Sequence, residues 1–285
     1  EADHRVPRDI WKKMGREGFL CTGVPVEYGG HGKDFLYSVI ILEELVRTNQ
    51  TGLMAQLHSD IVVPYIESFG SEQQKKKYLP GCVSGDIVTA VAMTEPGAGS
   101  DVASMTSTAV EQGEEVVIDG AKTFISNGIH CDLAVVAAKD PAVENPHKAV
   151  SLYLVEAGTP GFKKGQAIEK LGMHSQDTAE LFFTNCRIPK DNLLGKKGHG
   201  FVMLMQKLQQ ERLICAIWPA AVAATLLEWT KKYCRETEIN GMPMTQSQAV
   251  RFAFAEMETE LRVVRAFLND LIMDHIEKKK VNTET

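Results

Sequence analysis

The stretch Met93-Thr94-Glu95-Pro96-Gly97-Ala98-Gly99-Ser100-Asp101 follows a short β-prone run, Val88-Thr89-Ala90-Val91-Ala92. A strand is therefore expected to lead directly into a turn, in which Pro96 fixes one backbone angle and the two glycines allow conformations that other residues resist. Such a turn can aim several backbone N–H groups and two hydroxyls at one point, which suits a negatively charged ligand. A plain Pro-Gly turn is the alternative interpretation of this segment.

Two further segments carry comparable information. In Ile118-Asp119-Gly120-Ala121-Lys122-Thr123-Phe124-Ile125-Ser126-Asn127-Gly128, the Asp119-Gly120 pair predicts a type I′ hairpin between two apolar runs. Gln210-Glu211-Arg212-Leu213 lies inside a run with helical periodicity.

Composition narrows the class of protein. The chain has 285 residues, 44% of them hydrophobic, and a net charge of −6, which indicates two or three cores and argues against nucleic-acid binding. The six cysteines contain no CxxC pair and predict reduced thiols, while the eight scattered histidines predict no metal site. No apolar run is expected to reach the length of a membrane span.

The hydrophobic period changes twice along the chain, and it predicts helical segments at 1–87 and 197–285 around a middle β-domain at 88–196. Ser71 is expected to cap a helix that ends near Pro80-Gly81. One long helix is expected from Phe201 to about Cys234 and another from Gln248 to Ile276. The stripe of the second helix is Val250, Phe254, Met257, Leu261, Val264 and Phe267. The period-two runs predict an antiparallel sandwich or barrel, with strands at 88–93, 115–118, 122–126, 133–138, 149–155 and 179–188.

Together, the quoted segments resemble the acyl-CoA dehydrogenases, FAD enzymes that desaturate acyl-CoA thioesters, and especially their long-chain branch. Lys170-Leu171-Gly172-Met173 and Gln176-Asp177-Thr178-Ala179-Glu180-Leu181-Phe182-Phe183 fit the same branch. The resemblance implies an α+β fold with an N-terminal helical domain, a middle β-sandwich or barrel and a partial C-terminal helical bundle. Compared with this family, the chain is expected to be shortened at both ends.

Glu211 is the candidate base. Removal of an α-proton requires a carboxylate shielded from water, because burial raises a carboxyl pKa toward neutrality. Glu211 continues the stripe Leu204, Leu208, Glu211, Cys215 and is expected to point inward. The alternative is a structural glutamate paired with a distant arginine. In the long-chain and isovaleryl branches the glutamate of this Glu-Arg-Leu motif is the base, and the resemblance implies that its backbone N–H and a flavin ribityl hydroxyl bind the thioester oxygen.

The resemblance also assigns contacts to coenzyme A and to FAD. Arg212 corresponds to an arginine near the coenzyme A entrance, with a structural arginine as the alternative, and Gln209 to a substrate contact. Ser100 is implied to be shared between substrate and flavin, and Phe124 to pack on the isoalloxazine unless it is an ordinary core aromatic. The positions implied to contact FAD are Val91, Met93, Thr94, Gly99, Ser100, Phe124, Ser126, and, from a neighbouring subunit, Arg235 and Gln248.

The sequence between Arg235 and Gln248 departs from the family pattern. Relatives usually follow the arginine with Phe-Gly, whereas this chain has Glu236-Thr237-Glu238-Ile239-Asn240-Gly241, and the interval to Gln248 is longer by two residues.

The resemblance implies oxidation of an acyl-CoA to a trans-2-enoyl-CoA in fatty-acid β-oxidation or related catabolism. Electrons would pass to an electron-transferring flavoprotein, from a homotetramer in a mitochondrial matrix or bacterial cytoplasm. The alternatives are an acyl-CoA oxidase, a flavin monooxygenase or a non-catalytic scaffold.

Overall fold

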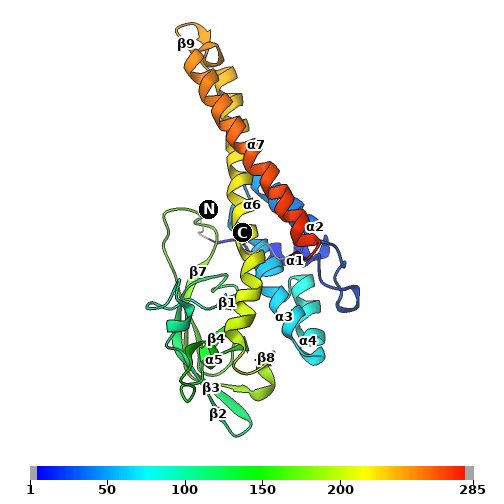
Figure 1. Ribbon diagram of the computed structural model, residues 1–285, viewed down its shortest axis with the longest axis vertical. Coiled ribbons are helices and arrows are strands. Elements are labelled where there is room, and N and C mark those ends of the chain that lie inside the picture. Colours follow the sequence, from blue (N-terminus) through cyan, green and yellow to red (C-terminus); the bar gives the residue numbers. More distant parts are fainter. Residues whose placement is uncertain (1–4, 280–285) are drawn as a thin grey trace. The chain divides into compact units, whose positions relative to one another are not determined.

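The computed structural model describes residues 5–279 of the chain. It contains two compact units, whose elements are labelled in Figure 1. One unit holds the chain up to Lys33 together with Thr51–Leu208, and the other holds Asp34–Gln50 together with the chain from Gln209 onward. The longest helix, α6 (Gly200–Glu236), therefore contributes its first turns to one unit and its remainder to the other.

Short helices begin the first unit. In α1 (Asp9–Arg16) the buried side chains are Trp11 and Met14, which lie one turn apart on the same face. Ser71 caps α4 (Glu72–Ser84) as predicted, because its hydroxyl accepts the N–H of Gln74 while the Gln74 side chain accepts the N–H of Ser71. The other helical elements are α3 (Val63–Phe69), α5 (Pro146–Ala149), a π-helix at Leu57–Val62 and 3₁₀ turns at Val26–Tyr28, Thr51–Leu53, Val102–Ser104 and Lys190–Asn192.

The predicted end of α4 near Pro80-Gly81 is wrong, because the helix continues through Pro80 to Ser84. A proline inside a helix removes one backbone hydrogen bond, but the buried side chains Leu79, Cys82 and Val83 on either side keep this helix packed. It ends where Gly85 adopts a left-handed φ of +77°.

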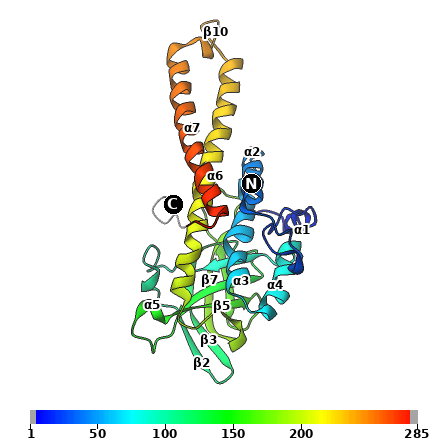
Figure 2. The ribbon, with the colours of Figure 1, turned by 45° about the vertical axis from the view of Figure 1, so that its right-hand side comes forward.

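The strands of the first unit form an eight-stranded sheet in the described part of the chain (Figure 2). Their order is β6-β7-β3-β2-β4-β5-β8, with β1 also paired to β4. Most neighbours are antiparallel, as predicted, but β1 and β2 each pair with β4 in parallel. The strands are β1 (Thr89–Ala92), β2 (Thr108–Gln112), β3 (Glu115–Ser126), β4 (Leu133–Lys139), β5 (Val150–Glu156), β6 (Phe162–Ala167), β7 (Thr178–Pro189) and β8 (Leu193–Leu194).

The period-two pattern identifies β1, β3, β4, β5 and β7 and misses the other three. In β6, which lies at one end of the sheet order, Phe162 is the one fully buried side chain, so the strand lacks an alternating apolar signal. Phe162 stacks on Phe183 of β7 with ring centroids 4.9 Å apart. A two-residue strand such as β8 is too short for any period to show.

The hairpin predicted at Asp119-Gly120 is wrong, because both residues lie inside the continuous strand β3. The strand has an irregularity there, where its register with β7 shifts between Ile118 and Gly120. The Asp119 carboxylate accepts the N–H of Asn185 across the sheet (2.7 Å). The actual two-residue turn lies at Gly113, with φ of +63°, between β2 and β3.

A glycine is needed at position 120 because Ser107 lies very close to its Cα, and not because the chain turns there. Its φ is +151°, and a Cβ at this position would lie 2.2 Å from Ser107 Oγ and 2.8 Å from Ser107 Cα. We therefore expect Gly120→Ala to lower the free energy of unfolding by about 2–4 kcal/mol. Urea denaturation would measure the change. The matched control is Gly172→Ala, because a Cβ there meets nothing within 4 Å; equal stability losses for the two variants would contradict this explanation.

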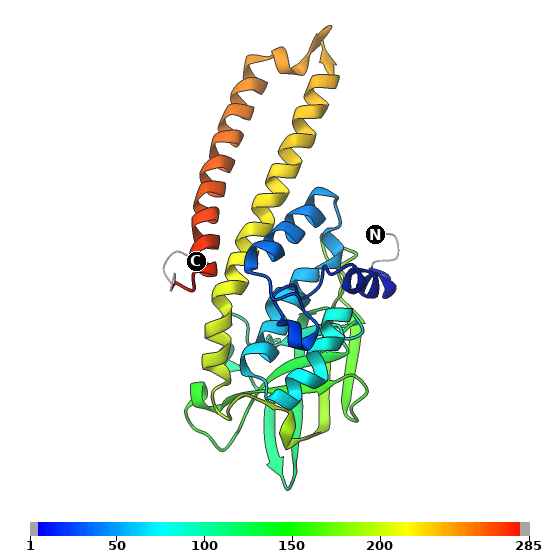
Figure 3. The same cartoon turned by 90° about the vertical axis from the view of Figure 1, so that its right-hand side faces the viewer.

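The second unit consists of helices joined by a small hairpin. The helix α7 (Gln248–Ile276) has the predicted bounds, and α6 and α7 run side by side from their connection (Figures 1 and 3). The preceding helix α2 (Phe35–Arg47) contacts α7, where Arg265 pairs with Glu43. The connection contains the strands β9 (Glu238–Ile239) and β10 (Met242–Pro243) and a 3₁₀ turn at Met244–Gln246.

The predicted stripe of α7 is not its buried face. The buried side chains of this helix are Leu268, Leu271 and Ile272, near its C-terminal end. Met257, Val264 and Phe267 are exposed. An open apolar groove of about 540 Å³ lies between α6 and α7, lined by Ala216, Pro219, Ala220, Ala223, Leu226, Leu227, Thr230, Met257, Glu260, Leu261 and Val264.

The expectation that no apolar run reaches the length of a membrane span is also wrong. Among the described residues, α6 is long and apolar enough to cross a membrane. Core helices of soluble proteins meet the same criterion. Length and composition alone are therefore weak evidence for a membrane span.

Candidate active site

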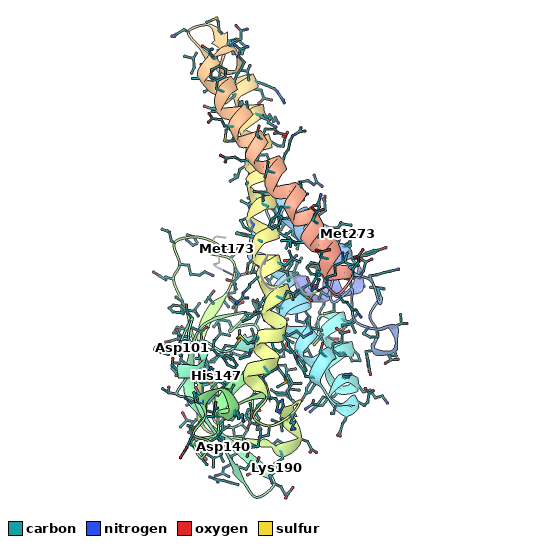
Figure 4. The ribbon with its side chains drawn as sticks, viewed as in Figure 1. Asp101, Asp140, His147, Met173, Lys190 and Met273 are labelled. Carbon is teal, nitrogen blue, oxygen red and sulfur yellow. The ribbon has the colours of Figure 1, made fainter. Side chains whose placement is uncertain are left out.

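The predicted strand-to-turn motif forms a tight turn after β1. The N–H of Glu95 donates to the carbonyl of Ala98 (2.8 Å), and the N–H of Ala98 donates to the carbonyl of Glu95 (3.1 Å). Neither Gly97 nor Gly99 adopts a positive φ, so the expectation of special glycine conformations is wrong. Both glycines are exposed, and a Cβ on either would meet nothing within 4 Å, which leaves their peptide groups open to a ligand. Figure 4 shows Asp101, at the end of this motif, on the surface of the first unit.

Phe124 is the most unusual side chain beside this turn. It is 64% exposed and has a left-handed φ of +58°, in a bulge where the register of β3 with β7 shifts between Lys122 and Ile125. The alternative of an ordinary core aromatic is therefore wrong. The N–H of Thr123 donates to the carbonyl of Thr94 (2.9 Å), so the bulge is tied directly to the first motif. Backbone strain of this kind persists where the surroundings over-determine it, and it is frequent at ligand sites.

The end of β3 is held by Asp177. Ser126 is half-buried, and the next residue, Asn127, has a left-handed φ of +60°. The N–H of Asn127 donates to the carbonyl of Asp177 (3.0 Å), and the Asp177 carboxylate accepts the N–H groups of Ile129 (2.5 Å) and His130 (3.1 Å). The position of Ser126 is thus fixed by a turn whose donors are satisfied by a side chain from the loop before β7.

A buried ion pair lies under the turn. The Lys122 ammonium donates to the Glu95 carboxylate (2.8 Å) and to the carbonyl of Met93 (3.1 Å), and both charged side chains are almost fully buried. The Glu95 carboxylate also accepts the N–H groups of Thr106 (2.5 Å) and Ser107 (2.9 Å). Burial by itself would raise the pKa of Glu95, but these hydrogen bonds and the Lys122 charge outweigh it and hold that pKa at about 2.

His58, in the π-helix, supports the start of β1. Its Nδ1 accepts the N–H of Thr89 (3.1 Å), which leaves Nε2–H to donate to the carbonyl of Cys82 (3.0 Å). The ring is fully buried and packs edge-on against Trp11. Burial lowers the pKa of His58 to about 4, against the opposing effect of the hydrogen bond to Cys82.

This histidine predicts a specific loss of stability in acid. In the unfolded chain His58 is protonated near pH 6.5, whereas in the folded chain it is protonated only near pH 4. Its contribution to the free energy of unfolding is therefore complete above pH 6.5 and is lost as the pH falls from 6.5 to 4. We expect this group to contribute roughly 3 kcal/mol to that loss. Urea denaturation of the wild type and of His58→Gln across this range would measure it, and identical pH slopes for the two proteins would contradict the assignment.

The first unit thus brings together the two segments that the sequence singles out. They present half-buried apolar side chains, hydroxyls and one exposed, backbone-fixed aromatic ring, which is a donor set suited to a flat aromatic cofactor and not to a metal ion. The residues that fit the FAD implied by the resemblance are Val91, Met93, Thr94, Gly99, Ser100, Phe124 and Ser126.

Glu211 belongs to the second unit. It is half-buried, and the expectation that its whole stripe points inward is wrong, because Leu204 is buried whereas Cys215 is exposed. The surroundings change along α6, since Leu204 lies in the turns that belong to the first unit and Cys215 lies in the part that belongs to the second. Partial burial, and to a smaller extent the negative charge of Glu211, raise the pKa of Cys215. The Glu211 carboxylate is therefore close to this thiol, on the same side of the helix.

The backbone N–H of Glu211 cannot serve the thioester oxygen. The residue lies well inside the continuous helix α6, where each N–H donates to the carbonyl four residues earlier, here that of Lys207. The implied role for this N–H is therefore incompatible with the structure.

The other predicted residues of the second unit lie on helix surfaces. Arg212 is exposed, and Gln209 is half-buried with a long contact from its amide to the carbonyl of Lys279 (3.5 Å). Arg235 and Gln248 are exposed at the two ends of the connection between α6 and α7. The segment that departs from the family pattern forms the β9–β10 hairpin, whose Asn240-Gly241 turn has positive φ at both residues.

Sequence reasoning missed the residues that hold the motifs in place, namely Glu95, Lys122, Asp177 and His58. Lys122 gave little local signal, because β3 also carries Glu115 and Asp119, and nothing in the sequence distinguishes its charge from theirs. The partners of His58 and Asp177 are 31 and 48 residues away in the chain, and no local pattern reports such contacts.

Comparison with known proteins identifies the family. Three consecutive segments match the acyl-CoA dehydrogenase N-terminal domain (residues 1–86), middle domain (90–186) and C-terminal domain (198–284). The chain belongs to the acyl-CoA dehydrogenase family. The resemblance seen in the sequence and the predicted fold class are both confirmed, and α6 is a helix of the family's C-terminal domain.

The relatives of this acyl-CoA dehydrogenase chain are FAD-dependent oxidoreductases. The mouse mitochondrial long-chain specific acyl-CoA dehydrogenase is 39% identical over 98% of this chain and 65% of its own length. The mitochondrial isovaleryl-CoA dehydrogenase of Pongo abelii is 36% identical over 92% of this chain and 62% of its own length. The crystal structure of an acyl-CoA dehydrogenase from Geobacillus kaustophilus superposes with a TM-score of 0.97, at 48% identity over 99% of this chain and 75% of that one. The chain thus spans about two thirds of the length of the curated relatives it matches.

Proposed function

We propose that this chain carries the flavin-binding and proton-abstracting parts of an FAD-dependent acyl-CoA dehydrogenase. The observation that supports this most strongly is the strained bulge that holds an exposed Phe124 beside Thr94. A core role does not explain an aromatic ring that is 64% exposed, whereas packing against the isoalloxazine does. Glu211 in the Glu-Arg-Leu motif supplies the carboxylate that the reaction requires.

In the proposed reaction the side chains divide the work. Bound FAD supplies the acceptor for the β-hydride. Thr94 would donate a hydrogen bond to the flavin ring system, Phe124 would pack against the isoalloxazine, and the half-buried Val91 and Met93 would exclude water from it. The Glu211 carboxylate takes the α-proton of the acyl thioester, and the product is a trans-2-enoyl-CoA.

Substrate and subunit contacts complete the proposal. Ser100 would be shared between flavin and substrate, Gln209 would contact the acyl-CoA, and Arg212, which is exposed, would provide positive charge for the polyanionic coenzyme A. Arg235 and Gln248 would reach the FAD of a neighbouring subunit in a homotetramer. Electrons leave to an electron-transferring flavoprotein, and the enzyme serves fatty-acid β-oxidation or related acyl-CoA catabolism in a mitochondrial matrix or a bacterial cytoplasm.

Flavin binding and oxygen reactivity test this proposal. The purified chain is mixed with FAD, and the visible flavin band is followed before and after anaerobic addition of acyl-CoAs of several chain lengths. Bleaching by an acyl-CoA, followed by slow reoxidation in air, is the expected result. Rapid oxygen consumption with hydrogen peroxide release would instead indicate an oxidase or monooxygenase, and absence of flavin binding would favour a scaffold without catalytic activity.

A further inference from the structure

We propose that the buried Glu95–Lys122 ion pair positions the flavin-contacting residues and sets the affinity and redox environment of the flavin, in addition to stabilising the fold. This inference rests on the proposed function. Neither residue is assigned a contact with FAD or substrate, so the pair would act through its neighbours.

The pair joins the two motifs at the points where they approach the cofactor face. Lys122 is the last regularly paired residue of β3 before the bulge that presents Phe124. Its ammonium donates to the carbonyl of Met93, and Glu95 lies on the other side of Thr94. Thr94 is therefore held through both of its chain neighbours and through its own carbonyl, which accepts the N–H of Thr123.

The acceptor set of Glu95 extends this clamp to a third segment. Besides Lys122, the carboxylate binds both the N–H and the hydroxyl of Thr106 (2.5 and 2.7 Å) and the N–H of Ser107 (2.9 Å). A carboxylate with this many donors has a defined orientation. The start of β2 is thereby fixed to the flavin turn through a single side chain.

Stability alone is a weak explanation for such a pair. Removing two charges from water is costly, and hydrophobic residues of similar volume often replace a buried ion pair without loss of stability. Hydrophobic side chains could fill the same volume under the sheet, but they could not direct the Met93 carbonyl or the turn after β1. The pair adds directional hydrogen bonds, and one of them ends at the carbonyl of Met93, a residue proposed to contact flavin.

The test removes both charges and keeps the volume. The double variant Glu95→Gln/Lys122→Met is compared with the exposed pair variant Glu111→Gln/Lys197→Met, whose side chains are each more than 40% exposed. Measurements are the FAD dissociation constant, the flavin absorption spectrum, the flavin midpoint potential and the melting temperature. We expect the buried double variant to melt close to the wild type but to bind FAD at least tenfold more weakly, with a shifted spectrum and potential. The control pair should change none of these.

The outcomes separate the two levels of the proposal. If the wild-type chain binds FAD and the folded double variant binds it equally well, with the same spectrum and potential, the pair is purely structural and the inference is wrong. If the wild-type chain binds no FAD, the proposed function fails and the inference fails with it. Should the double variant not fold, Glu95→Gln/Lys122→Gln replaces it, with the same expected loss of FAD affinity, because the shorter amide cannot reach the Met93 carbonyl.

Discussion

Replacing Glu211 by glutamine is expected to lower the rate of flavin reduction by an acyl-CoA by about a hundred- to ten-thousand-fold, the range typical for loss of a general base. The amide has nearly the shape of the carboxylate but cannot take the α-proton. Folding and FAD binding should be unchanged, because Glu211 is half-buried on α6 and belongs to a different unit from Thr94 and Phe124. Anaerobic stopped-flow reduction would measure the rate.

The matched control for this variant lies on the same helix. Glu228→Gln changes an exposed carboxylate that pairs with Lys231 one turn away, and it should reduce flavin at the wild-type rate. A Glu211→Gln rate within tenfold of the wild type would show that another group accepts the proton.

Lys122→Met should lower the free energy of unfolding by about 3–5 kcal/mol. The substitution leaves the Glu95 carboxylate buried without its cation, and the Met93 carbonyl loses the ammonium that donates to it. Urea denaturation of the variant and the wild type at neutral pH measures the difference.

The control is Lys197→Met. Lys197 pairs with Glu111 (2.8 Å) and Asp140 (3.1 Å), but its side chain is 43% exposed, so its loss should cost less than about 1 kcal/mol. Comparable losses of stability for the two lysine variants would mean that burial does not strengthen the Glu95–Lys122 pair.

In acid, the contribution of Glu95 to the free energy of unfolding should disappear as the pH falls from 4.5 to about 2, because its folded pKa lies below its unfolded value.

The helical segments were the most predictable part of the fold. The bounds of α7 follow from the sequence alone, and so does the Ser71 cap, because helix periodicity and capping depend on residues a few positions apart. The face that α7 buries was not predictable in the same way, since it depends on which elements pack against it. Its exposed Met257, Val264 and Phe267 and its buried Leu268, Leu271 and Ile272 are equally apolar in sequence.

In the β-domain, local sequence signals predicted the structure less well than they did in the helices. Asp119-Gly120 has a strong local signal for a turn, yet tertiary contacts keep both residues in one strand, because Asn185 binds Asp119 and Ser107 packs against Gly120. Local turn chemistry was overridden by pairing with β7. The motif at 93–101 indicated a ligand turn, but the unusual backbone lies at Phe124 and not at the glycines.

For the candidate site, sequence supplied the residues proposed to touch ligands, and the structure supplied what holds them. Thr94 and Phe124 are recognisable in sequence through the family resemblance. The clamp made by Glu95 and Lys122, 27 residues apart, becomes visible only when the strands are assembled. The Glu211 N–H illustrates the reverse case, in which the helix excludes a role that the resemblance implied.

The most direct test of the proposed dehydrogenase is product analysis after a single anaerobic turnover of the FAD-loaded chain with a saturated acyl-CoA. We expect one trans-2-enoyl-CoA, lighter than the substrate by two hydrogens, for each flavin reduced, and almost none with Glu211→Gln. Reduced flavin without enoyl-CoA, or enoyl-CoA formed equally well by Glu211→Gln, would show that Glu211 and FAD do not carry out this reaction.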